Sequence, residues 1–325
     1  MKVATVGVHV LDTHVIGIES IPERSDGQLV ERISLSPAGT AGGTAVVLSR
    51  LGAEVASYGA VGTDPVATTL LALLEAEGVD TSGLVRKGEH QTSASVIPVR
   101  PDGQRPAWHC IGANGAFTLD DLDLAALEGI THLHLGGPEF LGGEAAGRLL
   151  AHARSIGATT SVDLLAPGDP DMLAWVADAL PHTDHLLPND EQVLGLTGAA
   201  SLAEGALALL DLGVGAVAVT QGARGALVAS STGGSPHVVE VPAYAVDVVD
   251  TTGCGDAFSA GYLRGLALGR DLPGAAALGC ATAAQVARGL GTDAGSYSLD
   301  SVLDLAAATA RTGARTGART AAPAG

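Results

Sequence analysis

Residues 248–258 read Val-Val-Asp-Thr-Thr-Gly-Cys-Gly-Asp-Ala-Phe and connect a β-rich run to an apolar helix through a Gly-X-Gly turn. Glycine lets the backbone amides of such a turn approach an anion closely, and the helix N-terminus adds partial positive charge. Preorganised donors of this kind stabilise a phosphoryl group during transfer. Asp256 stands at the start of the helix, either as a base for an incoming hydroxyl group or only as a residue that favours the helix dipole.

The chain before this motif alternates between strands and helices. From residue 131 onward the pattern predicts strands at 131–135, 158–163, 184–187 and 215–220, and helices at 143–156, 171–180, 201–212, 255–268 and 272–288. Strands that are separated by helices pair in parallel through crossover connections. The sequence therefore predicts an α/β fold with a doubly wound, mostly parallel sheet flanked by helices.

Two earlier segments have a different character. Residues 14–36 alternate loosely between apolar and polar positions, as exposed strands do. Residues 92–111 are typical of a β-hairpin around Asp102-Gly103. We therefore predict a small separate β-sheet, built from about residues 13–37 and 91–112.

The composition excludes several classes of partner. The chain has 325 residues, is 46% hydrophobic and carries a formal net charge of −18. That charge repels nucleic-acid phosphate and anionic lipid, so we expect neither nucleic-acid nor membrane partners. The three cysteines are widely spaced and odd in number, which favours a reducing cytoplasm over a disulfide framework.

The C-terminal end differs from the rest of the chain. Residues 309–325 contain repeats of Ala-Arg-Thr-Gly and offer no apolar surface to bury. Such low-complexity segments cannot offset the entropy cost of ordering. We predict one domain over residues 1–308 and a disordered tail after it.

The nine residues Asp250–Phe258 resemble the C-terminal signature of the ribokinase-like (PfkB) carbohydrate and nucleoside kinases, and the similarity runs from residue 1 to about residue 300. The resemblance implies a ribokinase-like fold in which the small sheet is a lid over the acceptor. It also implies an ATP-dependent kinase in which Asp256 is the base and the amides of Gly253, Cys254 and Gly255 form an anion hole. Cys254 stands where Ala is commoner, so we expect it to fill space.

On the acceptor side, the resemblance assigns contacts to residues near the first strand and the lid. Asp12 follows Gly7 by five residues, which is similar to the spacing of the family's substrate-binding carboxylate. Gly43 departs from the pattern, because many relatives carry there an Asn that contacts the sugar. The predicted acceptor residues are Asp12, Gly39, Thr40, Gly43, Asn114 and Glu139, of which Asn114 equally fits an ordinary turn and Glu139 an exposed loop.

On the nucleotide side, two segments resemble the family. Residues 220–225 resemble its Thr-X-Gly-X-X-Gly loop, and residues 189–192 resemble its Asn-X-X-Glu segment, which supports water-bound Mg²⁺. Gln192 stands in the Glu slot, so either the metal–water network is weakened or Glu191 replaces it. The resemblance implies nucleotide contacts from Asn189, Thr220, Gly222, Gly225 and Gly255, Mg²⁺ held through water near Asn189 and Glu191, and K⁺ as a further candidate near Asp250 and Thr252.

These features predict transfer of the ATP γ-phosphoryl group to a hydroxyl of a small sugar, ribose- or fructose-like. A nucleoside kinase is the alternative, because Gly43 removes a sugar contact and Trp108 in the lid offers a ring that can stack on a base. A ligand-binding regulator without phosphotransfer is a third reading, motivated by Gln192 and Gly43. Lids of relatives often pair between subunits although some relatives are monomeric, so a homodimer through the lid is also an expectation.

Overall fold

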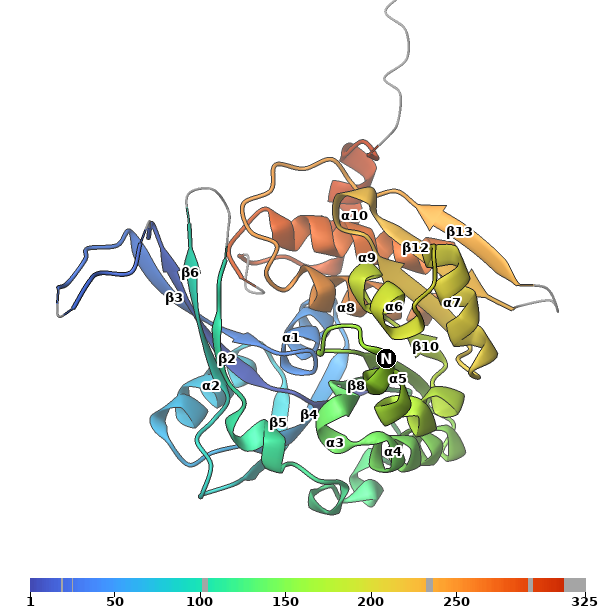
Figure 1. Cartoon of the computed structure of the whole chain (residues 1–325), viewed down its shortest axis with the longest axis horizontal. Helices are drawn as coiled ribbons and strands as arrows, with labels where there is room; N and C mark the ends of the chain where they lie inside the picture. Colours follow the sequence, from blue (N-terminus) through green and yellow to red (C-terminus); the bar gives the residue numbers. More distant parts are fainter. Residues whose placement is uncertain (19, 25, 101–104, 232–235, 292–294, 313–325) are drawn as a thin grey trace, which may run out of the picture.

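A nine-stranded sheet forms the centre of the molecule (Figure 1). The computed structural model describes all residues except 19, 25, 101–104, 232–235, 292–294 and 313–325. The sheet order is β13-β12-β11-β10-β9-β8-β1-β4-β5, and every pair from β11 to β5 is parallel. Its strands are β1 (Lys2–Gly7), β4 (Glu54–Val61), β5 (Asp80–Arg86), β8 (His132–Gly136), β9 (Thr159–Asp163), β10 (His185–Leu186), β11 (Ala216–Thr220), β12 (Ala226–Ser230) and β13 (His237–Val241).

Both faces of this sheet are buried. On β12, Ala226 and Val228 pack into one hydrophobic cluster, whereas Leu227 and Ala229 pack into another. Successive side chains of a strand point to opposite faces, so each cluster is the core on one face of the sheet. Two-sided burial explains why strands such as β11, with the sequence AVAVT, are apolar throughout.

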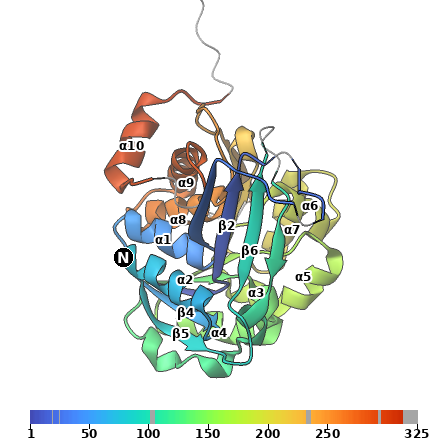
Figure 2. The ribbon, with the colours of Figure 1, turned by 90° about the vertical axis from the view of Figure 1, so that its left-hand side faces the viewer.

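Helices supply the other half of each core (Figures 1 and 2). One cluster draws residues from α1, α2, α8, α9 and α10, and the other from α4, α6 and α7. The helices are α1 (Gly42–Arg50), α2 (Pro65–Ala76), α3 (Pro138–Leu141), α4 (Gly143–Ser155), α5 (Pro170–Val176), α6 (Asp190–Thr197), α7 (Leu202–Asp211), α8 (Cys254–Ala267), α9 (Leu272–Ala287) and α10 (Leu299–Ala308), with short 3₁₀ turns at Gly112–Ala116, Leu119–Asp121, Leu124–Leu127, Ala177–His182 and Gly222–Arg224.

A second sheet of four strands stands beside the main one, and Figure 2 faces it. Its order is β3-β2-β6-β7, from strands β2 (Val10–Ile16), β3 (Arg32–Ala38), β6 (Ala94–Val99) and β7 (Trp108–Cys110). β2 and β6 run parallel, and each has an antiparallel neighbour at the edge. We call this sheet the lid.

The lid begins earlier than the sequence predicts. β2 starts at Val10, before the expected boundary at 13, so Asp12 lies on a lid strand and not on a loop after β1. On β2 the buried residues are Leu11, Asp12 and His14, so burial alternates only from Asp12 onward and gives no clear period-2 signal before it. The predicted turn at Asp102-Gly103 lies outside the described residues.

The predicted α/β fold is confirmed, with a few elements that the sequence pattern did not reveal. The strands and helices expected from 131 to 220, and the two long helices after 254, are present. Among the elements that were missed are the short helix α6 and the antiparallel strands β12 and β13. These elements have between five and eight residues, too few for periodicity to be decisive.

The start of the predicted tail contacts the domain. The amide of Thr312 donates to the carbonyl of Ala243 at 2.8 Å, and Arg311 lies over the ring of Tyr244. Residues 311 and 312 thus contact the domain beyond the predicted boundary at 309, and residues 313–325 lie outside the described part of the chain. In that part, no single helix is long and apolar enough to cross a membrane, although the bent pair α6–α7 passes by length and composition.

Candidate active site

Three neighbouring strands end at the same level at the carboxyl edge of the main sheet. Gly7 of β1 pairs with Gly136 of β8, which in turn pairs with Asp163 of β9. Ligands of open α/β sheets bind outside the carboxyl ends of their strands. This edge is therefore where the predicted site residues should meet, and the N-terminus of α8 also lies there, because Ser259 Oγ donates to Asp163 Oδ2 at 3.0 Å.

The glycine turn before α8 has the conformation that an anion site requires. Gly253 is the N-cap residue with φ 75°, a left-handed conformation that glycine adopts without strain. Among the described residues, the amides of Gly253 and Gly255 donate to no protein acceptor. A Cβ atom at Gly255 would meet nothing within 4 Å. The turn therefore presents free amides and open space to a ligand.

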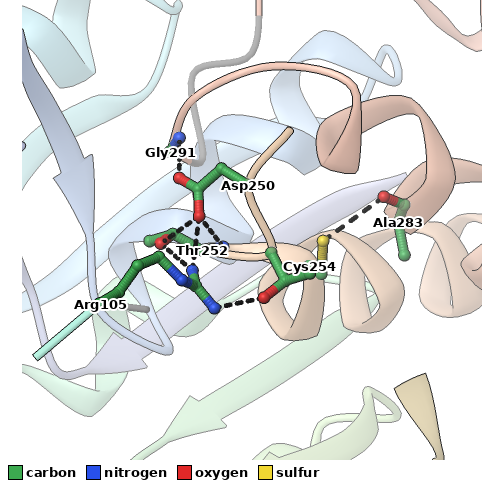
Figure 3. Close-up of polar contacts among 7 residues, drawn as sticks. Arg105, Asp250, Thr252, Cys254, Ala283 and Gly291 are labelled. Carbon is green, nitrogen blue, oxygen red and sulfur yellow. Dashed lines mark hydrogen bonds and ion pairs between the residues drawn. The ribbon is translucent and has the colours of Figure 1, made fainter. Parts of the chain in front are cut away.

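Cys254 contributes less to this turn than expected. Its amide donates to the carbonyl of Thr251 at 3.2 Å, so this amide is already paired. Its thiol points toward the carbonyl of Ala283, 3.6 Å away (Figure 3). Burial raises the pKa of the Cys254 thiol to about 12. The thiol is thus protonated at neutral pH and fills space between α8 and α9.

Asp256 lies in the first turn of α8, among other carboxylates. Desolvation raises its pKa well above the ordinary value, and the charges of Asp163 and Asp12 raise it further. Burial also raises the pKa of Asp163 to about 7, with the charge of Glu139 adding to the rise and hydrogen bonds from Ser259 and the Leu164 amide offsetting part of it. A carboxylate with a raised pKa binds a proton more tightly, so it is suited to accept a proton from an alcohol.

Gly43 lies directly against Asp256. A Cβ atom built on Gly43 would stand 2.2 Å from Asp256 Oδ2 and 2.8 Å from its Cγ. No real contact is that short, so any side chain at position 43 would displace the Asp256 carboxylate. This gives a physical reason for the departure at Gly43, because the space that a side chain would occupy holds the carboxylate.

Asp12 faces the site from the lid. It pairs with Ser95 on β6 and with Ser36 on β3, and all three side chains are buried. Burial raises the pKa of Asp12, while the Ser95 hydroxyl and the rings of His14 and His109 offset part of the rise. The inner face of the lid therefore carries hydrogen-bonding groups.

Two predicted acceptor residues are engaged with the protein. The Asn114 side-chain carbonyl accepts from the amide of His9 at 3.2 Å, and its amide donates to the His9 carbonyl at 3.0 Å. Glu139 Oε1 accepts from the amides of Leu165 and Ala166, each at 2.9 Å. Asn114 thus fixes the chain between β1 and β2, whereas Glu139 keeps one oxygen free of protein partners.

Several buried polar atoms around the site have no partner among the described residues. His9 shows the pattern: its Nδ1 lies 2.9 Å from the carbonyl of Gly7 and must donate, which leaves Nε2 as a bare acceptor. Burial lowers the pKa of His9 to about 4, so the ring is neutral. An unsatisfied buried group costs about 1–3 kcal/mol unless a ligand pairs with it. The atoms are His9 Nε2, His14 Nε2, Ser36 Oγ, Thr40 Oγ1, Thr44 Oγ1 and Glu139 Oε2.

Thr40 belongs to the turn that opens α1. Gly39 has φ 89°, and a Cβ atom there would stand 2.5 Å from the carbonyl of Val8. The amides of Ala41 and Gly42 donate to this carbonyl, each at 3.1 Å. Glycine at 39 therefore allows the turn to close on the end of β1, which places Thr40 at the carboxyl edge of the sheet.

An apolar cavity of about 300 Å³ lies beside the glycine turn that precedes Asp256. The predicted residues Thr220, Gly222, Gly225 and Gly255 line it, together with apolar side chains of α9. A Cβ atom at Gly222 would meet nothing within 4 Å, which leaves space for a planar group along this loop. The cavity joins the glycine turn to the 220–225 loop, as a nucleotide site requires.

Residues 189–192 form a helix cap beside this cavity. Asn189 pairs with Thr220 as an isolated bridge and caps α6 by accepting from the Gln192 amide at 2.8 Å. The Gln192 side chain accepts from the Asn189 amide and donates to the carbonyls of Leu164 and Ala166. Gln192 is therefore a structural residue with every side-chain group used.

The acidic residues of that segment have separate surroundings. Asp190 Oδ2 lies 2.9 Å from the Arg224 guanidinium, whereas Glu191 is exposed and its carboxylate has no partner among the described residues. Glu191 is thus the carboxylate that remains available to a hydrated metal ion. Magnesium bound with nucleotides takes most ligands from water and phosphate, so one nearby carboxylate fits that chemistry.

The segment before the glycine turn is held by an arginine from the lid (Figure 3). Arg105 Nη1 lies 2.6 Å from Asp250 Oδ1 and also donates to the Thr252 hydroxyl. Asp250 Oδ2 accepts from the Gly291 amide at 2.8 Å. Burial would raise the pKa of Asp250, but these hydrogen bonds and the Arg105 charge hold it below its ordinary value. The Arg105 guanidinium therefore occupies the position beside Asp250 and Thr252 that was the candidate site for K⁺.

Sequence reasoning missed two residues of this site. Asp163 ends a predicted strand of a parallel sheet, and that position alone would have marked it as a candidate. Arg105 gives no such signal, because its partners lie 145 to 147 positions away in the chain. Its role depends on how the lid folds over the main sheet.

Comparison with known proteins agrees with this geometry. The model of the pfkB family carbohydrate kinases matches residues 2–298. The chain is 31% identical over 241 residues to an uncharacterized sugar kinase from Archaeoglobus fulgidus, covering 73% of this chain and 93% of that protein. It is 26% identical over 270 residues to a nucleoside kinase from Methanothermobacter thermautotrophicus, covering 81% and 82%.

A solved structure shows the same fold. An E. coli protein provisionally described as ribokinase II, in complex with ATP and Mg²⁺, superposes with a TM-score of 0.78 at 23% identity, covering 94% of this chain and 98% of that chain. The fold and site thus define an α/β phosphotransferase with an alcohol acceptor. The chain belongs to the PfkB carbohydrate kinase family and is a sugar or nucleoside kinase. The predicted family, fold and enzyme class are confirmed.

Proposed function

We propose that this kinase transfers the γ-phosphoryl group of ATP to a hydroxyl of a small ribose- or fructose-like sugar. The observation that carries the proposal is the position of Asp256. Its carboxylate, with a raised pKa, lies between the glycine turn at a nucleotide-sized cavity and a group of unpaired polar atoms near the lid. A base must stand between donor and acceptor in an in-line transfer.

In the proposed step, the acceptor hydroxyl gives its proton to Asp256 as its oxygen bonds to the γ-phosphorus. The bond from phosphorus to the bridging oxygen breaks, and ADP leaves with that electron pair. The amides of Gly253 and Gly255 donate to the phosphoryl oxygens. They are held in place before the step, and such preorganisation is the main source of catalysis in phosphoryl transfer.

ATP and Mg²⁺ are the proposed cosubstrate and metal. The cavity of about 300 Å³, open space over Gly222 and Gly255, and the free amides of the glycine turn fit a nucleoside triphosphate. Glu191, beside Asn189, supplies the carboxylate that would hold metal-bound water. When bound, Mg²⁺ would neutralise phosphate charge; the chain's own residues orient the reacting groups.

The polar atoms without partners support a polyhydroxylated acceptor. Asp12, Thr40 and Ser36 offer acceptors or hydroxyls from the lid and the α1 turn, and His9 Nε2 and Glu139 Oε2 are bare acceptors. A molecule with several adjacent hydroxyl groups can satisfy many of them at once. An apolar alcohol would leave them unpaired, and that penalty would select against it.

A nucleoside is the alternative acceptor, but the lid weakens one argument for it. In the register of the lid, Trp108 pairs with Val96, whereas His109 pairs with Ser95 on the face of Asp12. Trp108 therefore lies on the outer face and cannot stack on an acceptor base. The nucleoside kinase among the relatives keeps this alternative worth testing.

An acceptor panel tests the proposal. ADP release would be followed with ribose, fructose, other sugars and nucleosides, each with ATP and Mg²⁺. We expect at least one sugar to give acceptor-dependent ADP release, with stoichiometric phosphorylated product. Turnover with nucleosides alone would replace the proposed acceptor with the alternative. Ligand-induced thermal stabilisation without ADP release for any compound would favour the non-catalytic regulator.

The outer face of the lid supports a homodimer as the quaternary state. It exposes apolar side chains that the strand register brings to one face, namely Ile33 (63% exposed), Leu35 (43%), Val96 (43%) and Trp108 (54%). A second copy of this chain would bury them. Sedimentation of the wild type and of Trp108→Lys tests this, because the substitution should shift the protein to monomer.

The three unpaired cysteines support a reducing, cytoplasmic location.

A further inference from the structure

Arg105 makes a contact that links the lid to the anion-binding turn. It lies between lid strands β6 and β7, and its guanidinium reaches the loop before α8 (Figure 3). There it meets the carboxylate of Asp250 at 2.6 Å and donates to the hydroxyls of Thr251 and Thr252. One side chain from the lid therefore bonds three consecutive residues of the main domain.

Asp250 connects that arginine to the rest of the site. Its side chain is fully buried, whereas that of Arg105 is 26% exposed. Asp250 Oδ1 also accepts from the Thr252 amide and hydroxyl, each at 2.9 Å, and Oδ2 accepts from the Gly291 amide. A buried carboxylate depends on such partners, and removing one partner of a buried pair leaves an uncompensated charge.

This contact can affect the reaction because it fixes the loop that directly precedes the glycine turn. Thr252 directly precedes Gly253, the left-handed N-cap residue of α8, whose amide donates to no acceptor among the described residues. A shift of the 250–252 loop would therefore move the amides of Gly253 and Gly255. The negative charges of Asp12 and Asp250 and the ring of His14 lie close to one another at the base of the lid, so a cation is also favoured there on electrostatic grounds.

We propose that Arg105 is a positioning residue: its guanidinium serves as a fixed cation that holds the loop 250–252 in place and fastens the closed lid to it. The proposal rests on the proposed kinase function. In this chain the Arg105 guanidinium supplies the positive charge that a loosely bound monovalent ion would otherwise supply beside this loop. The acceptor side and the phosphoryl side of the site are then coupled through one side chain.

Substitution of Arg105 tests this role. For Arg105→Ala we expect kcat/KM for the acceptor to fall about 10- to 100-fold, because small misplacements of catalytic groups cost rates of that order. KM for ATP should change less than kcat/KM for the acceptor, because Arg105 itself does not line the cavity and touches it only through Thr251. ATP hydrolysis without acceptor should take a larger share of turnover, because the lid excludes water less well. Arg105→Lys should be intermediate, because it keeps the charge and loses the fork of donors.

Rescue by small cations distinguishes positioning from mere structure. Millimolar guanidinium, or K⁺ in place of a bulky organic cation, should restore part of the Arg105→Ala rate and leave the wild type unchanged. Arg32→Ala is the matched control: it removes an exposed lid arginine whose guanidinium makes no hydrogen bond or ion pair among the described residues. A wild-type rate for Arg105→Ala, or a loss that no small cation restores, would overturn the proposal.

Hydrogen exchange separates this proposal from the proposed function. If the wild type shows no turnover with any acceptor, the kinase proposal has failed, but the fastening can still be measured. Arg105→Ala should then speed amide exchange at Thr252 and Gly291 and in β6, while α4 keeps its protection. Unchanged exchange in those segments would contradict the fastening.

Discussion

The nucleotide end and the acceptor end of the proposed site use different parts of the protein. The nucleotide end consists of backbone: glycines at 253, 255, 222 and 225 and a helix N-terminus, arranged along a preformed cavity. The acceptor end consists of side chains, among them Asp12 of the lid sheet, and of buried polar atoms that have no partner among the described residues. The difference teaches that the nucleotide end is ready before any ligand binds. The acceptor end depends on the lid and on its substrate.

Asp256 lies at the junction of the two ends, so its loss should have the largest effect. For Asp256→Asn we expect kcat to fall about a thousandfold, as removal of a general base does. The affinity for ATP should stay within about threefold, because the amides and the cavity are intact. Turnover and nucleotide binding would be measured on the same sample. Near-normal turnover would show that another group takes the proton.

Gly43 tests whether the acceptor end tolerates a side chain. For Gly43→Ala we expect kcat to fall about 100-fold, because the new methyl group must displace the Asp256 carboxylate. Gly88→Ala is the control, since a Cβ atom there has only ordinary contacts with Thr63 at 3.8 Å or more. Equal rates for both variants would mean that Asp256 adapts without loss of function.

Asp163 should tune the pH dependence across the junction. Asp256 acts in its ionised form, so the rate is lost as the pH falls through its raised pKa. The negative charge of Asp163 contributes to that rise, and Asp163→Asn removes it. The acid limb of kcat/KM should then move to lower pH. A limb that stays in place would assign the titration to another group.

Gln192 tests the nucleotide end, and here the expected effect on rate is the smallest. In Gln192→Glu, a carboxylate oxygen would face the carbonyls of Leu164 and Ala166 in place of a donor. We expect a loss of about 1–3 kcal/mol in the free energy of unfolding, and an unchanged Mg²⁺ dependence. Thermal unfolding and a Mg²⁺ titration check both parts. Tighter Mg²⁺ dependence without loss of stability would contradict the structural role of Gln192.

The same contrast explains what the sequence could predict. The sheet, its flanking helices and the glycine turn follow local rules of periodicity and backbone freedom, and the family motif is contiguous from Asp250 to Phe258. The same kind of rule would have marked Asp163 as a candidate, because it ends a predicted strand of the parallel sheet. The residues proposed for the nucleotide end therefore lie in short contiguous segments that sequence rules can indicate.

The acceptor end was harder to predict because it depends on distant contacts. The bonds from Arg105 to the loop 250–252 join positions more than 140 apart in sequence. The sequence fits Asn114 equally to a substrate contact and to an ordinary turn, and in the structure both of its polar side-chain atoms bind the backbone of His9. For Trp108 the sequence leaves both base stacking and sheet packing open, and only the strand register places it on the outer face. No local pattern carries such information.

The comparison of the two ends is tested most directly by ATP binding and turnover with and without an acceptor. Calorimetry would measure ATP affinity, and ADP release would be followed in the presence and absence of the best sugar of the panel. We predict that ATP binds without an acceptor, and that ADP release is slow until the acceptor is added. Rapid ATP hydrolysis without any acceptor, or ATP binding that requires the acceptor first, would contradict this account.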